Sequence, residues 1–239
     1  MKVSSLKNLV RLSFSRFAES YNREAFLQKE ASKILSEFAG CVQGIGVDLG
    51  CGTGFLYDAL PDKNIVGVDI SMDMIRMYMK KNRQAVVGDI ENLPFKDASF
   101  DFAVSNFSLH WTDLKKSFKE VYRVLRKDGI FVFNIPFYGS LEIIQEILGK
   151  ETFDFLCVPE ILKTLKDAGF HIQDFFAEDL EATFDNGYKL LSHLHRTGVS
   201  LNTKNTSLKE KREIVRKFKS YKKDALLKYR LLFVKAYKY

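Results

Sequence analysis

Val47-Asp48-Leu49-Gly50-Cys51-Gly52-Thr53-Gly54 carries the strongest structural signal in the chain, because an apolar run ends in an acid and passes into a glycine-rich turn. Glycines in such a turn let the backbone approach a ligand closely, and a helix that follows offers unpaired amide groups. The spacing D-x-G-x-G-x-G differs from the G-x-G-x-x-G of dinucleotide-binding turns. We therefore expect a ligand site at the end of this strand that is built differently from a dinucleotide site.

Short apolar runs alternate with helical patterns on both sides of this turn. The pattern predicts strands over 45–49, 65–68, 85–87, 102–105 and 130–135, and helices over 71–81 and 114–125. Such alternation is typical of a parallel sheet with helices on both faces. The fold class is therefore α/β, with a Rossmann-like, doubly wound and mostly parallel sheet.

The two ends of the chain complete this architecture. Apolar residues at three- and four-residue spacing predict helices over the first forty residues, which would cap the sheet or cover a ligand. Further helices are expected over 159–168, 187–196 and 208–221, and strands over 170–176 and 226–237. We expect the last two strands to finish the sheet as an antiparallel edge pair. The expected organisation is a single domain over 1–239, with a helical lid over 1–40, a ligand-binding core over 44–135, and acceptor-side helices and last strands over 136–239.

Further polar residues follow the next three predicted strands. Asp69 comes 21 residues after Asp48, where doubly wound folds place a carboxylate on ribose hydroxyls. Asp89 follows the third strand and Asn106 the fourth. Because open parallel sheets bind ligands at the carboxyl ends of their strands, these side chains are expected around one site.

Composition limits the class of protein. The 239 residues are 46% hydrophobic and 28% charged, which is close to globular averages. No stretch has the roughly 18 uninterrupted apolar residues of a membrane span, and the start resembles no secretion signal. Three cysteines without a C-x-x-C pair argue against a disulfide framework and a structural zinc site. We therefore expect a cytoplasmic protein with no membrane partner and no metal.

The formal charge of +7 is unevenly distributed along the chain. Residues 201–239 hold 13 Lys/Arg against 3 Asp/Glu, so this segment carries +10 and the first 200 residues carry −3. Such a segment would attract an acidic protein, a nucleic acid or a phosphate-bearing ligand. A solvated helix face is the alternative interpretation.

With these motifs in order, the chain resembles the class I S-adenosylmethionine-dependent methyltransferases. The resemblance rests on Asp48 to Gly54, Asp69, Asp89 with the run Leu93 to Asp101, and Arg123 to Ile130. It implies S-adenosyl-L-methionine as the cofactor, with Asp48 near the ammonium, Asp69 on the ribose and Asp89 near the adenine. The cofactor-binding residues that it implies are Arg16, Gln28, Asp48, Gly50, Cys51, Gly52, Asp69, Ile70, Met74, Asp89, Ile90 and Asn106.

A narrower resemblance, to the malonyl-acyl carrier protein O-methyltransferases of biotin synthesis, covers nearly the whole chain. It rests on Ser13 to Tyr21 with Gln28, on Asp89 to Pro94, on Gly139 to Glu142, and on Leu190 through Ser200. It implies methylation of the free carboxylate of a malonyl thioester on acyl carrier protein. The carrier is acidic, so the basic C-terminal segment would be complementary to it.

The methyl acceptor implies further candidate residues. Tyr21 and Phe17 are candidates for a lid over the cofactor, and His110 and Trp111 follow strand four, where this fold keeps acceptor-facing residues. All four have a packing role as the alternative. Arg196 or Arg123 would hold the malonyl carboxylate, and the sequence does not choose between them.

Two other functions stay open at this point. One is a methyltransferase for a small molecule such as a quinone precursor, which would not need the basic C-terminal helix. The other is a non-catalytic or RNA-binding member of the fold, in which Phe218, Tyr221 and Tyr229 would stack on bases between the cations.

Overall fold

The computed structural model of the chain describes residues 3–60, 64–80, 83–199 and 207–239. In these residues, seven strands form one sheet in the order β3-β2-β1-β4-β5-β7-β6. The strands are β1 (Ile45–Leu49), β2 (Asn64–Asp69), β3 (Gln84–Val87), β4 (Phe100–Ser105), β5 (Leu125–Pro136), β6 (His171–Phe184) and β7 (Ala225–Tyr237). The predicted α/β sheet is confirmed, since each predicted strand appears with its bounds shifted by a few residues or extended.

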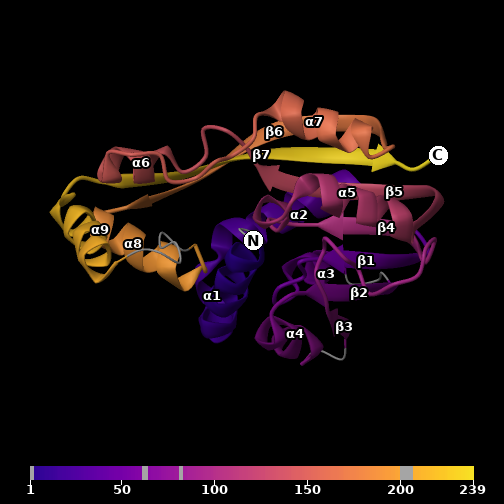
Figure 1. Ribbon diagram of the computed structural model, residues 1–239, viewed down its shortest axis with the longest axis horizontal. Helices are drawn as coiled ribbons and strands as arrows, with labels where there is room; N and C mark the ends of the chain where they lie inside the picture. The colour runs from indigo at the N-terminus through magenta and orange to yellow at the C-terminus, as the bar shows by residue number, and fades with distance from the viewer. Residues whose placement is uncertain (1–2, 61–63, 81–82, 200–206) are drawn as a thin grey trace.

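The first five strands run parallel, and β7 lies antiparallel between β5 and β6. The expected antiparallel pair at the edge is therefore present, with β6 as the outermost strand. β6 and β7 are long, and Figure 1 shows them extending past the other strands to the end of the molecule where α6, α8 and α9 gather.

Helices cover both faces of the sheet. The longer ones are α1 (Val3–Glu24), α2 (Phe26–Ala39), α5 (Leu114–Val124), α7 (Val158–Asp167), α8 (Gly187–Arg196) and α9 (Leu208–Ser220). The shorter ones are α3 (Phe55–Ala59), α4 (Met72–Met79), α6 (Glu142–Leu148) and the 3₁₀ turn η1 (Leu109–Trp111). None of the helices in these described residues is long and apolar enough to cross a membrane.

Helix α5 illustrates how the sequence specifies these elements. Asp113 caps its first turn by accepting hydrogen bonds from the backbone N–H groups of Lys115 and Lys116. Leu114, Phe118 and Val121 follow at helical spacing and are buried against the sheet. This periodic apolar stripe makes α5 a cover for one sheet face, together with α7.

The opposite face is covered by α2, α6, α8 and α9. Their buried residues form one core with β4, β5 and β7, in which Leu35, Leu190 and Phe218 are almost fully enclosed. Helix α1 lies apart from this layer. It packs against α4 on one side and α8 on the other, so it spans the carboxyl ends of the first strands.

Candidate functional site

A pocket opens at the carboxyl ends of β1, β2, β3 and β4, as the sequence predicts. Its floor and walls include Gly50 and Gly52 after β1, Asp69 and Ile70 after β2, and Asp89 and Ile90 after β3. Met74, Asn106 and Trp111 also line it. A smaller adjoining pocket is lined by Asp48, Cys51 and Thr53, and it shares Tyr21, Gly50, Gly52 and Asn106 with the first.

The glycine-rich turn is shaped by left-handed backbone conformations. Gly50, Gly52 and Gly54 all have positive φ, which favours glycine. A Cβ atom on Gly50 would collide with Ser108, at 2.3 Å from its Cβ. A Cβ atom on Gly52 would meet nothing within 4 Å, so the space above Gly52 is pocket. This is the cradle that close approach of a ligand requires.

Asp69 connects the first two strand ends. Its Oδ2 accepts a hydrogen bond from the Gly52 N–H at 3.0 Å, and its Oδ1 accepts one from the Ser71 N–H at 2.8 Å. Burial raises the pKa of Asp69 to about 6, although these two backbone hydrogen bonds oppose the shift. The carboxylate is therefore fixed in orientation and keeps lone pairs for hydroxyl donors of a ligand.

Asp48 is a buried carboxylate whose Oδ2 has no hydrogen-bond partner among the described residues. Burial and the nearby negative charge of Asp69 raise the pKa of Asp48 to about 7, and the positive charge of Arg83 opposes this. A buried carboxylate oxygen without a partner is costly. An ammonium group in the smaller pocket would relieve that cost, so the residues present fit the methionine end of S-adenosylmethionine.

Asp89 lies at the other end of the pocket. Its Oδ1 accepts a hydrogen bond from the Glu91 N–H at 2.9 Å, and its Oδ2 accepts one from Lys7 Nζ at 2.5 Å. Lys7 also pairs with Glu91 at 2.8 Å. Burial lowers the pKa of Lys7, but the hydrogen bonds to both carboxylates outweigh it and raise the pKa above its usual value. Helix α1 is thus held to this strand end by an ion-pair cluster.

Helix α1 presents one stripe of side chains to the pocket. Lys7, Phe14 and Tyr21 recur every seven residues, so they share a helix face, and all three line the pocket. Tyr21 stacks on Phe55 at 5.7 Å between ring centroids, and Phe14 packs edge-on against Trp111 at 6.2 Å. Helix α1 therefore closes one wall of the pocket, and its role as a lid over the cofactor stays a prediction.

Several predicted residues lie away from the pocket. His110 does not line it: its ring packs among Phe107, Trp111 and Phe155, and its Nδ1 has no partner among the described residues. Burial lowers the pKa of His110 to about 3, so the imidazole is neutral. The Gln28 side chain is buried and does not line the pocket, but its backbone carbonyl accepts a hydrogen bond from Asn106 Nδ2. The side chains of Arg16 and Phe17 lie outside the described residues.

The two arginines considered for an acceptor carboxylate have different surroundings. Arg123 donates hydrogen bonds to the carboxylates of Glu120 and Asp97 and to the carbonyls of Leu93 and Phe95. It therefore clamps the loop before β4 and does not line the pocket. Arg196 forms an ion pair with Glu24 at the end of α1, beside the lid.

Sequence reasoning missed six residues of the pocket wall as ligand contacts. They are Lys7, Phe14, Gly88, Phe107, Ser108 and Thr112. The seven-residue spacing from Tyr21 through Phe14 to Lys7 was a usable signal for Lys7. Ser108 had no such signal, because its hydroxyl is held by the Leu49 carbonyl of the neighbouring strand β1 and by the Ser105 hydroxyl.

Comparisons with known proteins agree with this geometry. The family model described as "Methyltransferase domain" matches residues 47–133, a range that includes Asp48, Asp69 and Asp89. A malonyl-[acyl-carrier protein] O-methyltransferase of Herminiimonas arsenicoxydans is 32% identical over 178 residues, 70% of this chain and 68% of that protein. One from Methylovorus sp. is 30% identical over 217 residues, 80% of this chain and 73% of that protein.

The fold has solved counterparts. A crystal structure described as an S-adenosylmethionine-dependent methyltransferase, possibly a histamine N-methyltransferase, from Thermotoga maritima superposes with a TM-score of 0.62. It is 21% identical, and the match covers 96% of this chain and 100% of that one. At this identity the likeness shows the fold.

Proposed function

This chain belongs to the S-adenosylmethionine-dependent methyltransferase family that includes the malonyl-[acyl-carrier protein] O-methyltransferases, and on that basis we propose that it methylates the free carboxylate of a malonyl thioester on acyl carrier protein, in biotin synthesis. The observation that carries the proposal beyond the relatives is the chemistry of the pocket wall. The wall is acidic where the cofactor belongs, and it is aromatic at Phe14, Phe107 and Trp111.

Each acid at the strand ends faces a different part of the cofactor in this proposal. Asp69 accepts hydrogen bonds from the ribose hydroxyls, and Asp48 stabilises the ammonium of the methionine part. Asp89 and the backbone amide of Ile90 face the adenine edge, while Ile70 and Met74 pack on its ring. Gly50, Cys51 and Gly52 leave room for the methionine carboxylate, and Asn106 lies beside it.

When bound, S-adenosylmethionine supplies an electrophilic methyl group on a sulfonium ion. Tyr21 lines both adjoining pockets, so its ring lies at their junction, where the methionine and adenosine parts meet. Tyr21 and the aromatic wall would hold the acceptor beside the cofactor. Holding the two reactants together in a pocket that excludes water makes the transfer effectively unimolecular.

The acceptor needs no general base. An ordinary carboxylic acid has a pKa near 4, so a malonyl carboxylate is already ionised at neutral pH. This agrees with the surroundings of His110, which is neutral and faces aromatic rings. Trp111 contributes as part of the acceptor wall. Neither candidate arginine lines the pocket: Arg196 is paired with Glu24 at the end of α1, and Arg123 is paired with Glu120 and Asp97.

A panel of acceptors tests this function. The enzyme is incubated with S-adenosylmethionine labelled in the methyl group and with malonyl-carrier, malonyl-coenzyme A, succinyl-carrier or a demethylated quinone precursor. We expect label on the malonyl thioesters, in a form that mild alkali releases as methanol, because a methyl ester hydrolyses and an N- or C-methyl group does not. Label on the quinone precursor alone would replace the proposal with a small-molecule methyltransferase.

A further inference from the structure

The outward face of α9 carries a row of cations. Lys209, Arg212, Arg216 and Lys219 follow one another at three- and four-residue spacing, so they share one helix face, and all four are exposed. Of the four, Arg216 is paired with an acid, Glu213, through an exposed i,i+3 contact. We call these four residues the α9 row.

The α9 row stands on a firmly held helix. Phe218 is fully buried on the inner face of α9, and Lys217 donates a hydrogen bond from Nζ to the Leu148 carbonyl at the end of α6 at 2.6 Å. The first turn is closed by a capping box between Ser207 and Glu210. The four cations therefore have fixed positions relative to one another. A basic segment that is only solvated would not need such anchoring.

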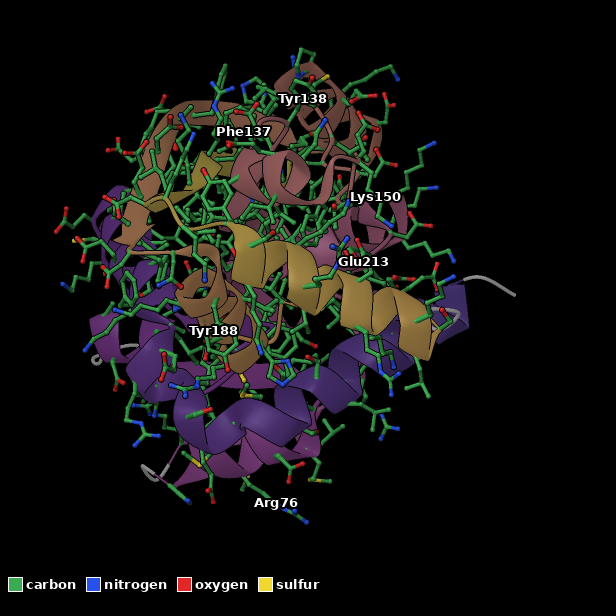
Figure 2. The ribbon with its side chains drawn as sticks, turned by 90° about the vertical axis from the view of Figure 1, so that its left-hand side faces the viewer. Arg76, Phe137, Tyr138, Lys150, Tyr188 and Glu213 are labelled. Atoms are coloured by element: carbon green, nitrogen blue, oxygen red, sulfur yellow. The ribbon has the colours of Figure 1, made fainter. Side chains whose placement is uncertain are left out.

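Apolar side chains and further cations flank the α9 row. Leu208 and Val215 are exposed beside it, at 74% and 38%. Tyr188 on α8 is 54% exposed, and Lys219 Nζ lies 5.3 Å from the centre of its ring. Figure 2 shows α9 across the face of the molecule, with Lys150 on one side and Tyr188 on the other. A mixture of cations and exposed apolar groups is typical of a protein-docking surface.

Helix α8 connects this face to helix α1, which walls the pocket. α9 packs on α8, and a Cβ atom on Gly187 of α8 would lie 2.5 Å from the Phe218 carbonyl. After α8, Gly198 packs on Phe14, whose ring lines the pocket. The Gly198 carbonyl accepts a hydrogen bond from the Ser13 hydroxyl. One helix, about 10 Å across, therefore separates α9 from the lid.

We propose that the α9 row, with Leu208, Val215 and Tyr188, is the surface on which an acidic acyl carrier protein docks. This inference rests on the proposed function and names the surface that its partner uses. The carrier would sit on α9 and pass its thioester arm alongside α8 to the lid. Complementary charge speeds such an encounter and fixes its orientation, and salt screens it. The acceptor's own binding in the pocket does not involve these residues.

The test compares two thioesters of the same acyl group. The variant Lys209→Glu/Arg212→Glu/Lys219→Glu reverses three exposed cations of the α9 row and leaves the Arg216–Glu213 pair intact. The matched control Lys119→Glu/Lys127→Glu/Lys166→Glu makes the same change in net charge at exposed positions on α5, β5 and α7. For both, kcat/KM is measured with malonyl-carrier and malonyl-coenzyme A between about 25 and 300 mM salt.

We expect the α9 variant to lose about tenfold or more in kcat/KM toward malonyl-carrier at low salt, the size of a typical electrostatic gain in association rate. Its kcat/KM toward malonyl-coenzyme A stays within about twofold of wild type, and the control variant resembles wild type with both. Wild type loses activity toward the carrier as salt rises, and the α9 variant does so less. An unchanged kcat/KM toward malonyl-carrier in the α9 variant would overturn the proposal.

A direct measurement of carrier binding separates two outcomes: that the carrier does not dock on α9, and that the enzyme does not methylate a malonyl thioester. Anisotropy of a fluorescent, unacylated carrier is titrated with each variant, which needs no methyl transfer. We expect the carrier to bind wild type and the control, and to bind the α9 variant at least tenfold more weakly. If a single-stranded RNA oligonucleotide binds instead, and only its binding is lost in the α9 variant, the surface is a nucleic-acid site and the proposal is wrong.

Discussion

Asn134 of β5 holds Asn106 at the end of β4: its Nδ2 donates a hydrogen bond to Asn106 Oδ1 at 2.7 Å. Its Oδ1 accepts a second hydrogen bond from the Phe107 N–H at 2.9 Å. Asn134 is fully buried, and Phe107 has the positive φ of a residue in the left-handed region. One amide thus fixes two residues of the pocket wall.

Replacing Asn134 by Leu should impair catalysis more than folding. The change leaves the Phe107 N–H buried without an acceptor, which costs about 1–3 kcal/mol in the free energy of unfolding. We expect kcat to fall about tenfold or more, because Phe107 and Asn106 lose their fixed places. Asn134→Asp keeps the acceptor for Phe107 and should recover part of kcat. Steady-state kinetics with thermal unfolding checks this, and a variant with full kcat would refute the positioning role.

Gly52→Ala should abolish cofactor binding without unfolding the protein. The added methyl group would occupy the pocket, where nothing beyond the two neighbouring residues lies within 4 Å, and the positive φ costs about 1–2 kcal/mol. Gly40→Ala is a matched control, since Gly40 also has positive φ and open space, after α2. Calorimetry with S-adenosylmethionine should show binding lost only in Gly52→Ala. Equal affinities in both variants would remove Gly52 from the cofactor site.

Cofactor affinity should fall as pH falls through about 7 to 6. Asp48 and Asp69 have raised pKa values of about 7 and 6, and each must be ionised to accept from the ligand. Above pH 8 both are ionised and affinity is constant. Below about pH 6 each proton bound competes with the ligand, so the dissociation constant rises up to tenfold per pH unit for each group. Calorimetry between pH 5 and 9 measures this, and a flat profile would contradict it.

Asp48→Asn should stabilise the free protein near pH 8. In the folded state the pKa of Asp48 is raised, so its ionisation destabilises the fold as pH rises from about 4 to 7, and the full penalty is present above 7. Removing the charge is worth roughly 2–4 kcal/mol at pH 8 and little below pH 4. Denaturant unfolding at several pH values checks the sign. The same variant should bind the cofactor weakly, and a loss of stability at pH 8 would show that Asp48 has a partner.

Lys7→Met should weaken cofactor binding about threefold to tenfold. The change removes the ion pairs that hold α1 to Asp89 and Glu91, and α1 closes one wall of the pocket. Lys33→Met, which removes only an exposed pair with Glu30 on α2, serves as the control. Stopped-flow release of the cofactor should be faster in Lys7→Met alone. Unchanged release would mean that Lys7 does not hold the lid.

The positions of the strand ends around the site were predictable, because buried parallel strands appear in the sequence as short apolar runs. In this chain an acidic residue marks the end of each of the first three runs. The bounds of β5 were not predictable, since Leu125 pairs with Phe100 and Ile130 with Phe102, so four residues of β5 bulge out against one of β4. Those residues, Arg126 to Gly129, resemble a turn. Most of β6 was missed because this edge strand is largely exposed and polar. Helix α6 was missed because no side chain caps its start at Leu141.

The site shows the same division between local and tertiary information. Asp48 and Asp69 lie at the carboxyl ends of β1 and β2, and Asp89 follows β3. All three were predicted as site residues, and the structure brings them to one edge of the sheet. The direction of His110 was not predictable, because it depends on Phe155, far along the chain, packing against its ring. Sequence spacing gives the edge of the sheet on which a residue lies, whereas packing decides which way its side chain faces.

The most direct measurement is the intact mass of malonyl-loaded acyl carrier protein after incubation with the enzyme and S-adenosylmethionine. A carrier that bears an acetyl group, which lacks the free carboxylate, runs beside it, and Gly52→Ala serves as the inactive enzyme. The proposed function predicts a gain of one methyl group on the malonyl carrier alone, and with the wild-type enzyme alone. No gain in mass while the cofactor binds, or an equal gain on the acetyl carrier, would contradict it.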